Sequence, residues 1–357
     1  MRQQDRWEPV ADRATTDKLA RSTRKYSLVT VVYELEFDLL ALQARSVQRY
    51  CPENMIGSII VIDNFLHPLP RNKKLRLIAE YGPLARFVRI LRAEAIARIP
   101  ETKGWTAQQI LKLMVATHVE TERYVILDAK NHFVFSLTPE FLEAPDGRAR
   151  INVYGYESHA LRGHLVNVLH YLGIYSDDCL KRFTTSATPF VMYTDIVRKL
   201  VHDISEKEHA QFEAVFVRNR LTEFFLYIGY IMQSGISVRT LYDFHQVFCP
   251  VVWPEIADEK GCTSAITRST ERHAPLFGLH RRAIASFGKH ERNLIAEFLF
   301  NRNLFETKEA ANLFLLAFRR RYMQTQAKLI IQRRILNFYG FRPFRFMLAH
   351  RRPHRAC

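Results

Sequence analysis

The sequence predicts an α/β fold, with a mostly parallel β-sheet covered by helices and a more helical C-terminal half. Three observations support this class. Short apolar segments rich in β-branched residues alternate with amphipathic helical segments as far as residue 155, the order expected of a parallel sheet with helical crossovers. Several of these segments end in acidic or amide residues, as strands do at the carboxyl edge of such a sheet. After residue 155 the helical period dominates.

The first half opens as a βαβ unit and continues with further helix–strand pairs. Strands are predicted from continuous or β-branched apolar runs, and helices from a 3.6-residue apolar period. Gly82 and Pro83 end one helix, because both residues interrupt helices. In chain order we expect strand 27–33, helix 39–50, strand 58–63, helix 72–81, strand 87–91, helix 107–118, strand 124–128 and a further candidate strand at 149–155.

The second half is predicted to be mainly helical. Pro250, Pro254 and Gly261 mark a loop region within it. Residues 1–24 are polar and lack periodicity, so we expect a mobile leader there. Residues 291–357 are expected to form a basic helical C-terminal extension. The predicted helices are 158–172, 189–203, 220–233, 281–286 and 306–336.

The composition excludes a disordered chain. With 357 residues, of which 48% are hydrophobic, the chain can bury a substantial core. The N-terminal segment lacks the apolar stretch of a signal peptide, and no uninterrupted apolar run reaches the roughly 18 residues that a spanning helix needs. Five cysteines, without a C-x-x-C pair, fit a reduced chain. We therefore expect a cytoplasmic protein that is soluble or attached peripherally at the inner membrane.

The net charge of +16 is concentrated near the C-terminus. The chain from Arg319 onwards carries eleven Lys and Arg residues and no acid, which leaves +5 on the rest. Residues 308–339 interleave apolar residues with arginines, a pattern that suits docking of residues 308–357 on an anionic membrane surface. The alternative for the first part of this segment is packing on the domain. Nucleic acid would use the same charge, but the body carries no recognised nucleic-acid motif, so this partner is not expected.

Polar residues follow three of the predicted strands at the points where they end. Glu34, Asp63 and Asp128 hold these positions. Because the carboxyl ends of parallel strands meet at one edge of a sheet, we expect them to line one pocket. Asp128 is the strongest candidate, because it ends a buried run and Lys130 and Asn131 follow closely. Asp63 has the alternative role of an ordinary turn initiator.

The helix before the Asp128 strand carries polar residues that can reach the same pocket. Its sequence, GWTAQQILKL, places Gln108 and Lys112 one turn apart on one face, with Gln109 beside them. Such side chains can contact a sugar or a phosphate, and Trp105 can stack on a base or a sugar ring. The alternatives are a solvated helical face and a tryptophan that belongs to the core.

Five segments together resemble a bacterial family of uncharacterised proteins assigned to the GT-A-like glycosyltransferases, common in rhizobia and relatives. They are VVYELEFDLLALQARSVQRY, GWTAQQILKL, YVILDAKNHF, LTEFFLYIGY and FGLHRRA, and the resemblance covers residues 26–290. It implies a Rossmann-type domain over residues 25–290, with a nucleotide-binding half at 25–155 and an acceptor half at 156–290. It also implies a nucleotide-diphospho-sugar donor. The family's motif positions carry over as Asp128, Lys130, Asn131, Glu223 and His280.

The tip of the Asp128 strand resembles the Asp-x-Asp motif of these enzymes, in which a divalent ion, Mn²⁺ or Mg²⁺, bridges the acids and the diphosphate. The resemblance implies Asp128 and His280 as metal ligands. Lys130 stands in the place of the second acid, so two alternatives are open. Its ammonium can contact a phosphate and make the metal unnecessary, or it can point away and leave Asp128 with Asn131 or His132 as ligands.

The resemblance further implies Glu223 as general base. In inverting enzymes of this type, a glutamate at a helix start takes the proton of the acceptor hydroxyl. The alternative is a first-turn glutamate that complements the helix dipole. His280 and Arg281 are expected at the diphosphate, because arginine offers forked donors to phosphate. For His280 the alternative is a structural role.

The function predicted from the sequence is that of an enzyme, a glycosyltransferase of hexosyltransferase type that moves a sugar from a nucleotide-diphosphate donor to a glycan or lipid-linked acceptor. One alternative is a non-catalytic protein of the same fold that binds nucleotide sugars or glycans. Another is nucleic-acid binding through the basic tail. The chain contains no G-x-S-x-G, Walker or G-x-G-x-x-G motif, so serine-hydrolase and P-loop chemistry are not expected.

Overall fold

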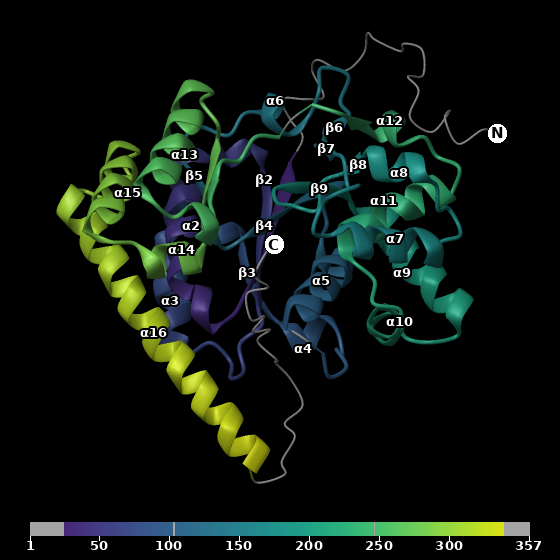
Figure 1. The fold of residues 1–357 in the computed structure, drawn as a ribbon, viewed down its shortest axis with the longest axis horizontal. Helices are drawn as coiled ribbons and strands as arrows, with labels where there is room; N and C mark the ends of the chain where they lie inside the picture. Colours follow the sequence, from purple (N-terminus) through teal and green to yellow (C-terminus); the bar gives the residue numbers. More distant parts are fainter. Residues whose placement is uncertain (1–24, 103, 246, 339–357) are drawn as a thin grey trace.

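The computed structural model describes residues 25–102, 104–245 and 247–338 (Figure 1). At its centre lies a five-stranded sheet of order β3-β2-β1-β4-β9, in which all neighbours run parallel except β4 and β9. The predicted fold class is thereby confirmed. The expected leader and the chain beyond residue 338 lie outside the described residues. The strands are β1 (Tyr26–Val32), β2 (Ile56–Asp63), β3 (Val88–Arg92), β4 (Arg123–Asp128) and β9 (Phe190–Tyr193).

Helices cover both faces of this sheet (Figure 1). The chain adds β2 and β3 on one side of β1 and then returns to place β4 on the other side. Right-handed crossovers therefore put α2 (Phe37–Tyr50) and α3 (Arg71–Glu80) on one face and α5 (Gly104–Met114) on the opposite face. The strand order reverses between β1 and β4, and at such a point the carboxyl ends of the strands leave a crevice for ligands.

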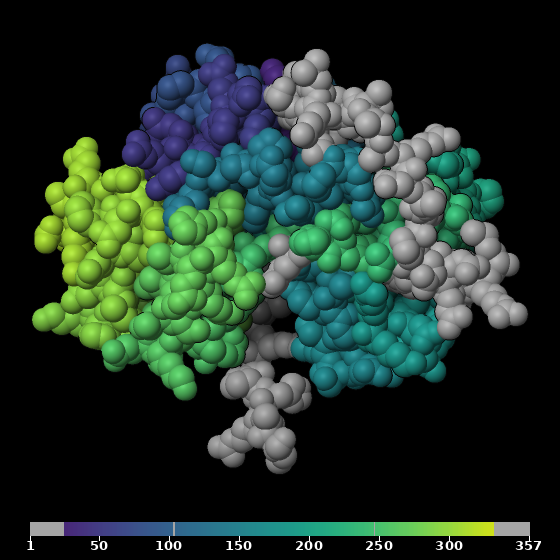
Figure 2. Space-filling view, turned by 90° about the horizontal axis from the view of Figure 1, so that it is seen from above, coloured from purple at the N-terminus to yellow at the C-terminus, as the bar shows by residue number. Residues whose placement is uncertain are grey.

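A helical lobe lies beside β9, and the C-terminal helices lie on the side of α2 (Figure 1). The space-filling view shows a hollow in the surface between these two parts (Figure 2). The lobe contains α7 (Arg162–Tyr171), α8 (Asp177–Lys181), α9 (Thr194–Glu208), α10 (Phe212–Arg218), α11 (Glu223–Gln233) and α12 (Val238–Leu241). The C-terminal helices are α13 (Glu259–Glu271), α14 (Arg281–Ser286), α15 (Lys289–Asn301) and α16 (Lys308–Phe338). Short elements are α4 (Ala93–Ile96), α6 (Pro139–Leu142), β5 (Asn131–Phe133), β6 (Ala149–Arg150), β7 (Val153–Tyr154), β8 (Phe183–Thr184), β10 (Tyr242–Asp243), β11 (Val251–Val252) and β12 (Leu276–Leu279).

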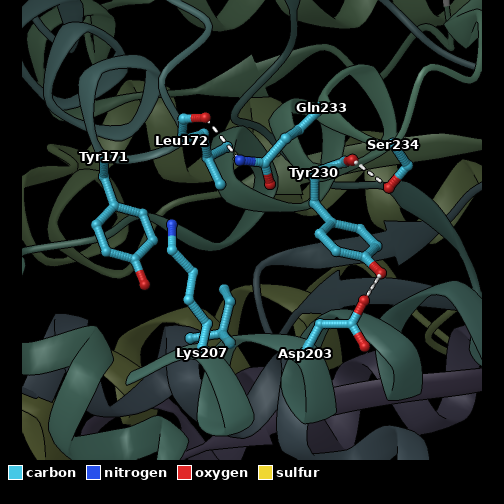
Figure 3. Close-up of a pocket in the computed structure, with 8 residues that line it drawn as sticks. Tyr171, Leu172, Asp203, Lys207, Tyr230, Gln233 and Ser234 are labelled. Carbon is cyan, nitrogen blue, oxygen red and sulfur yellow. Dashed lines mark hydrogen bonds between the residues drawn. The ribbon is translucent and has the colours of Figure 1, made fainter. Parts of the chain in front are cut away.

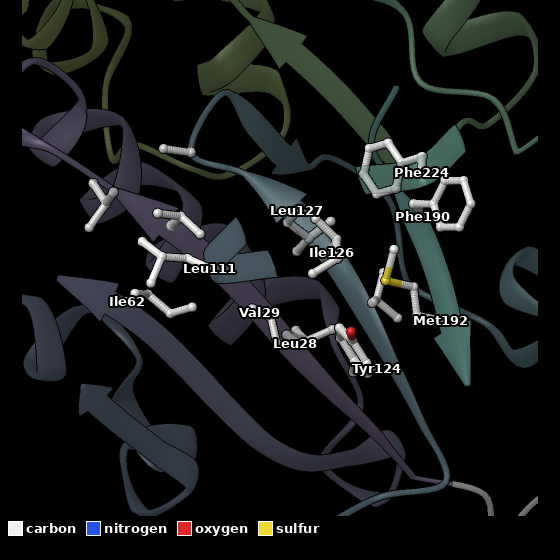
Figure 4. Packing of buried hydrophobic residues seen from close by; sticks show 14 of the residues in the cluster. Leu28, Val29, Ile62, Leu111, Tyr124, Ile126, Leu127, Phe190, Met192 and Phe224 are labelled. Atoms are coloured by element: carbon white, nitrogen blue, oxygen red, sulfur yellow. The ribbon is translucent and has the colours of Figure 1, made fainter. Parts of the chain in front are cut away.

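The core of the molecule is built on the apolar runs of the central strands. Every residue of β1 is buried, and β4 is buried as far as Leu127. Strands covered on both faces carry continuous apolar runs, which is why these segments can be identified from the sequence. Figure 4 shows their side chains together with those of β9 and Phe224 of α11. The rings of Phe190 and Phe224 stack with centroids 4.2 Å apart.

Three predicted segments differ from the structure. The helix expected at 189–203 begins only at Thr194, because Phe190–Tyr193 pairs with β4 as strand β9. Its aromatic and β-branched side chains fit a buried edge of the sheet, and this packing overrides the helical period. The strand expected at 149–155 is divided into β6 and β7, which pair with different partners. The loop region expected at 250–261 contains β11 and the start of α13.

A small three-stranded sheet, of order β11-β12-β5, was not predicted from the sequence. Strand β12 runs antiparallel to β5 with Gly278 opposite Asn131, and the backbone N–H of Leu279 donates to the carbonyl of Lys130 at 2.9 Å. A Cβ on Gly278 would lie 2.6 Å from the side chain of Val251, so this close approach requires glycine. The small sheet thereby joins the tip of β4 to the segment that begins α14.

The last described helix, α16, runs along the outside of the molecule close to its predicted position (Figure 1). Its inner face is buried against the C-terminal helices through Ala311, Leu315, Phe318 and Tyr322. Within the described ranges, no helix is both long enough and apolar enough to cross a membrane.

Candidate active site

The tips of the three central strands meet at one edge of the sheet. In the strand register, Asp128 at the end of β4 lies opposite Val31, and Asp63 at the end of β2 lies opposite Val32. The two acids therefore flank β1 at nearly the same level. The chain leaves β1 through a short 3₁₀ helix, Glu34–Glu36, at this same edge.

Gln43 of α2 fixes the turn between β4 and β5. Its amide nitrogen donates to the carbonyl of Asp128 at 2.8 Å and to that of Asn131 at 2.9 Å. Its Oε1 accepts from the hydroxyl of Thr30 at 2.8 Å. Asn131 Oδ1 in turn accepts from the backbone N–H of Asp128 at 2.8 Å. These bonds hold the backbone from which Asp128 and Lys130 extend.

Four charged side chains of alternating sign form a chain across this edge. Lys112 Nζ lies 3.1 Å from Asp128 Oδ1 and 3.4 Å from Glu223 Oε1. Lys130 pairs with the other oxygen of Asp128. Lys112 comes from α5 and Glu223 is the first residue of α11, and both side chains are buried. The structure thus brings together four of the candidates predicted from separate segments of the sequence. We call them the charge chain.

Burial and mutual attraction set the protonation of the charge chain. Burial alone would raise the pKa of Asp128, but Lys112 and Lys130 hold it well below its ordinary value. Burial alone would lower the pKa of Lys112, but Asp128 and Glu223 raise it. Burial raises the pKa of Glu223, and the neighbouring Lys112 offsets this only in part. Of the two acids, Glu223 therefore accepts a proton more readily.

The position of Glu223 is set by the start of α11. Its backbone N–H donates to Gln109 Oε1 at 3.2 Å. Phe224 stacks on Phe190 of β9, and the Lys112 ammonium lies 5.2 Å from the centre of the Phe224 ring. Packing of α11 against β9 and α5 thus places the carboxylate next to Lys112.

Thr188 belongs to the site but was not predicted from the sequence. Its Oγ1 lies 3.0 Å from Asp128 Oδ2 and 2.8 Å from Asn131 Oδ1. It is joined to Pro189 by a cis peptide bond, directly before β9. No sequence signal marks this threonine, because its role arises only when β9 pairs with β4.

The ring of Trp253 contacts both Lys130 and His280 and so links these two side chains. The Lys130 ammonium is 5.3 Å from the centre of this ring, and the rings of Trp253 and His280 are 5.4 Å apart. His280 Nδ1 accepts from the backbone N–H of Arg282 at 3.3 Å and so caps α14. Burial, followed by the charges of Arg281, Lys130 and Arg282, lowers the pKa of His280 to about 3. The imidazole is therefore neutral at neutral pH.

Arg281 ties α14 to the tip of β1. It forms an ion pair with Glu36, and its guanidinium lies 5.2 Å from the centre of the Tyr33 ring. Burial alone would lower the pKa of Arg281, but Glu36 and Tyr33 raise it. The next residue, Arg282, is exposed. Glu36, like Trp253, was not predicted as a site residue, because both lie at this edge only after distant segments come together.

Among the buried polar atoms at this edge, three near the tip of β1 and the start of α11 have no hydrogen-bond partner within the described chain. They are the hydroxyl of Tyr33, Nε2 of Gln109 and Oγ1 of Thr222. Buried polar groups in folded proteins are nearly always paired. Unpaired atoms at the tip of β1 and around the start of α11 are expected where a polar ligand or an ordered water completes them.

Asp63 takes a different role from the other strand-tip acid. One of its oxygens accepts from the backbone N–H of Leu69 at 2.9 Å, and the other accepts from that of Phe65 at 3.2 Å and from Arg92 at 2.9 Å. The carboxylate is fully buried. These contacts correspond to the turn-forming alternative, and they use both oxygens.

Three further side chains lie apart from the charge chain. Trp105 is 44% exposed and packs edge-on against His164. Gln108 is half-buried, one turn before Lys112. His132 is fully buried, its Nε2 lies 3.3 Å from a backbone carbonyl oxygen, and burial lowers its pKa to about 4. Its Nδ1 has no hydrogen-bond partner within the described residues.

A separate cavity of about 180 Å³ lies in the helical lobe (Figure 3). Its polar groups are largely paired: the hydroxyl of Tyr230 donates to Asp203 at 2.6 Å, and the amide of Gln233 donates to the carbonyl of Leu172 at 2.6 Å. None of its lining residues belongs to the charge chain. A second cavity, of about 410 Å³, is lined by Glu213 and the segment after β3 and is also distinct from the charge chain.

The fold and this edge define an α/β protein with a charged, partly unpaired cluster at the switch point of a parallel sheet. The chain belongs to a family of unknown function, DUF6492, whose model matches residues 45–252. The matched region includes Asp128 and Glu223 and ends before Trp253 and His280. No curated protein is similar enough to count as a relative.

Several solved structures are similar to this chain. A galactosyltransferase, LgtC, in complex with donor and acceptor sugar analogs has a TM-score of 0.45 and 12% identity, over 76% of this chain and 95% of that one. The bifunctional glycosyltransferase WbbM has a TM-score of 0.45 and 12% identity, over 82% of this chain and 51% of that one. The glycosyltransferase GlyE of Streptococcus pneumoniae has a TM-score of 0.40 and 9% identity, over 83% of this chain and 63% of that one. At these scores no residue role is transferred from them.

Proposed function

We propose that this protein is a glycosyltransferase that moves a sugar from a nucleotide-diphosphate donor to a hydroxyl of a glycan or lipid-linked acceptor. The position of Lys112 carries this proposal. Its ammonium bridges Asp128, at the tip of β4, and Glu223, at the start of α11. It thereby connects an edge suited to a diphosphate with a buried carboxylate suited to act as a base. The motif resemblance supplies the class of reaction.

In the proposed reaction the acceptor oxygen attacks the anomeric carbon as the bond from that carbon to the diphosphate oxygen breaks. The bonding electron pair leaves with the nucleoside diphosphate, and the proton of the acceptor hydroxyl passes to Glu223. The raised pKa of Glu223 suits this step, because a stronger base takes the proton more readily. On the donor side we assign the diphosphate to Lys130, His280 and Arg281, with Asn131 orienting Asp128.

The role of Glu223 is tested by Glu223→Gln. This change keeps the shape of the side chain but removes the basic carboxylate, so we expect the transfer rate to fall by roughly 10²–10⁴-fold. Donor affinity, measured by calorimetry, should change by less than about threefold. The matched control is Glu213→Gln, which alters another buried glutamate outside the charge chain. A Glu223→Gln enzyme with the full transfer rate would remove Glu223 from the role of base.

The substrate class is tested separately with a panel of UDP-, GDP- and CDP-sugars, by following nucleotide release with acceptor glycans present. Turnover of at least one donor supports the enzyme. Donor binding without turnover in the unmodified protein favours the alternative, a non-catalytic protein that binds nucleotide sugars.

The outer face of α16 supports a second partner, an anionic membrane surface. Leu313, Met323 and Ile331 expose 65%, 55% and 56% of their areas. With about 3.6 residues per turn, Leu313 and Ile331 lie on the face opposite the buried Leu315 and Tyr322, and Met323 lies at the edge of that face. Exposed apolar side chains that gather on one face of a helix indicate an interaction surface.

Cations surround this apolar stripe. Arg319, Arg320 and Lys328 are exposed, and the chain after α16 adds five further Arg residues and no acid. An apolar stripe flanked by cations matches a bilayer with anionic lipids, where each nearby cation contributes about 1 kcal/mol. We therefore assign the membrane contact to this face of α16, which leaves its inner face packed on the domain.

Liposome flotation tests the membrane contact. A triple variant, Leu313→Glu, Met323→Glu and Ile331→Glu, should lower binding to vesicles containing phosphatidylglycerol by more than roughly tenfold, because apolar burial is replaced by repulsion. The control is Leu75→Glu on α3, which alters an equally exposed leucine. Equal flotation of the triple variant and the unmodified protein would contradict the assignment, as would equal binding to neutral and anionic vesicles.

A further inference from the structure

The divalent ion of the Asp-x-Asp motif does not fit the charges around Asp128. Lys112 Nζ lies 3.1 Å from one carboxylate oxygen, Lys130 pairs with the other, and the hydroxyl of Thr188 lies 3.0 Å from that second oxygen. Mn²⁺ and Mg²⁺ bind where several anionic or neutral oxygens are open to them. Here both oxygens already face ammonium groups, which would repel the ion.

The second expected metal ligand is no better placed. His280 uses Nδ1 to accept from the backbone N–H of Arg282. The charges of Arg281, Lys130 and Arg282 all act on its imidazole, and the same charges oppose a divalent cation. Across the described ranges, no group of three or more His, Cys, Asp or Glu side chains is arranged to hold a metal ion.

The cations at this edge can neutralise the charge that a divalent ion would otherwise neutralise. When the sugar leaves a diphosphate, negative charge grows on the leaving oxygen and has to be neutralised. Lys130 is suited to this task, because it extends from the β4–β5 turn and its side chain is 13% exposed. Lys112 lies behind Asp128 and is 9% exposed. Arg282, on the first turn of α14, adds an exposed charge on the same side.

We propose that Lys130, backed by Lys112, takes the place of the divalent ion, so that the site binds the donor's diphosphate directly and without metal. This rests on the proposed function. Lys130 turns from Asp128 to the phosphate oxygens when the donor binds. Asp128 keeps its contacts with Lys112 and Thr188, so its charge stays compensated. Lys112 also holds the Glu223 carboxylate in place for the acceptor.

Calorimetry of the full chain with UDP, GDP and CDP, in EDTA and in Mn²⁺, tests this proposal. We expect one of the three to bind in EDTA with an affinity that Mn²⁺ changes by less than about threefold. Lys130→Met keeps the length of the stem over Trp253 but removes the charge, and should weaken binding in EDTA by roughly 10- to 100-fold. The control, Lys260→Met, alters an exposed lysine of α13 and should bind as the unmodified protein does.

A second variant should make nucleotide binding depend on the metal. Lys130→Asp restores the second acid of the Asp-x-Asp pair, so any binding should appear only with Mn²⁺. Binding of this variant in EDTA with unchanged affinity would contradict the proposal. Thermal unfolding of each variant verifies that it folds, which we expect because Asp128 keeps two other partners.

The outcomes separate the two proposals. Binding to the unmodified protein only in Mn²⁺ overturns the metal-free site but leaves the glycosyltransferase proposal standing. If Lys130→Met binds in EDTA with unchanged affinity, the role of Lys130 is overturned and the glycosyltransferase proposal still stands. Failure of all three nucleotides, with and without Mn²⁺, overturns both proposals.

Discussion

Two opposing effects set the charge of Glu223, the proposed base. Burial raises its pKa above the ordinary value of 4.5, and Lys112 lowers it. Only the ionised carboxylate can take a proton, so kcat/KM should rise with pH through the raised pKa and level off above it. Lys112→Met removes the lowering charge. The acid limb should then move to higher pH, by about 1–3 units, in a pH profile of kcat/KM measured for both forms.

The control for this pH profile is Lys199→Met. Lys199 is exposed on α9 and pairs with Asp203, which is not part of the charge chain, so its removal should leave the acid limb in place. A limb that stays unchanged or moves to lower pH in Lys112→Met would show that Lys112 does not stabilise the ionised form of Glu223.

Single residues were predictable where their role follows from strand direction. Asp128 and Lys130 follow a buried run, and the tips of parallel strands converge whatever the loops between them do. Gln43 and Thr188 gave no such signal. Their types are common in helices and loops, and their contacts with the β4–β5 turn depend on segments that meet only in the fold. Asp63 shows the limit of the rule, because its carboxylate is used by its own turn.

At the scale of elements, length decides what a sequence pattern can indicate. Strands β1 and β2 have seven and eight residues, enough for an apolar run to stand out from its surroundings. Strand β9 has four residues and continues without a break into α9, so the period of the helix extends over it. The strands β5, β11 and β12 of the small sheet are equally short, with three, two and four residues. These strands form only because distant segments pair, so no local sequence pattern indicates them.

This small sheet matters for the site in spite of its size. It places Lys130 beside Leu279, and the next residue, His280, caps α14. Gly278 permits the close contact with Val251. The C-terminal residues predicted at the diphosphate are thus positioned by elements that could not be predicted, although their residue types could.

At the scale of the whole molecule, the two predicted halves share one sheet, because β9 pairs with β4. We therefore expect one unfolding transition, with equal midpoints by far-UV circular dichroism and by tryptophan fluorescence. Phe190→Ala removes a ring that is 2% exposed and should lower the free energy of unfolding by about 3–5 kcal/mol. Both signals should shift together. Phe300→Ala, at a 38% exposed position of α15, should change stability far less. Two separate midpoints in Phe190→Ala would instead mean that the halves unfold independently and that β9 contributes little to their union.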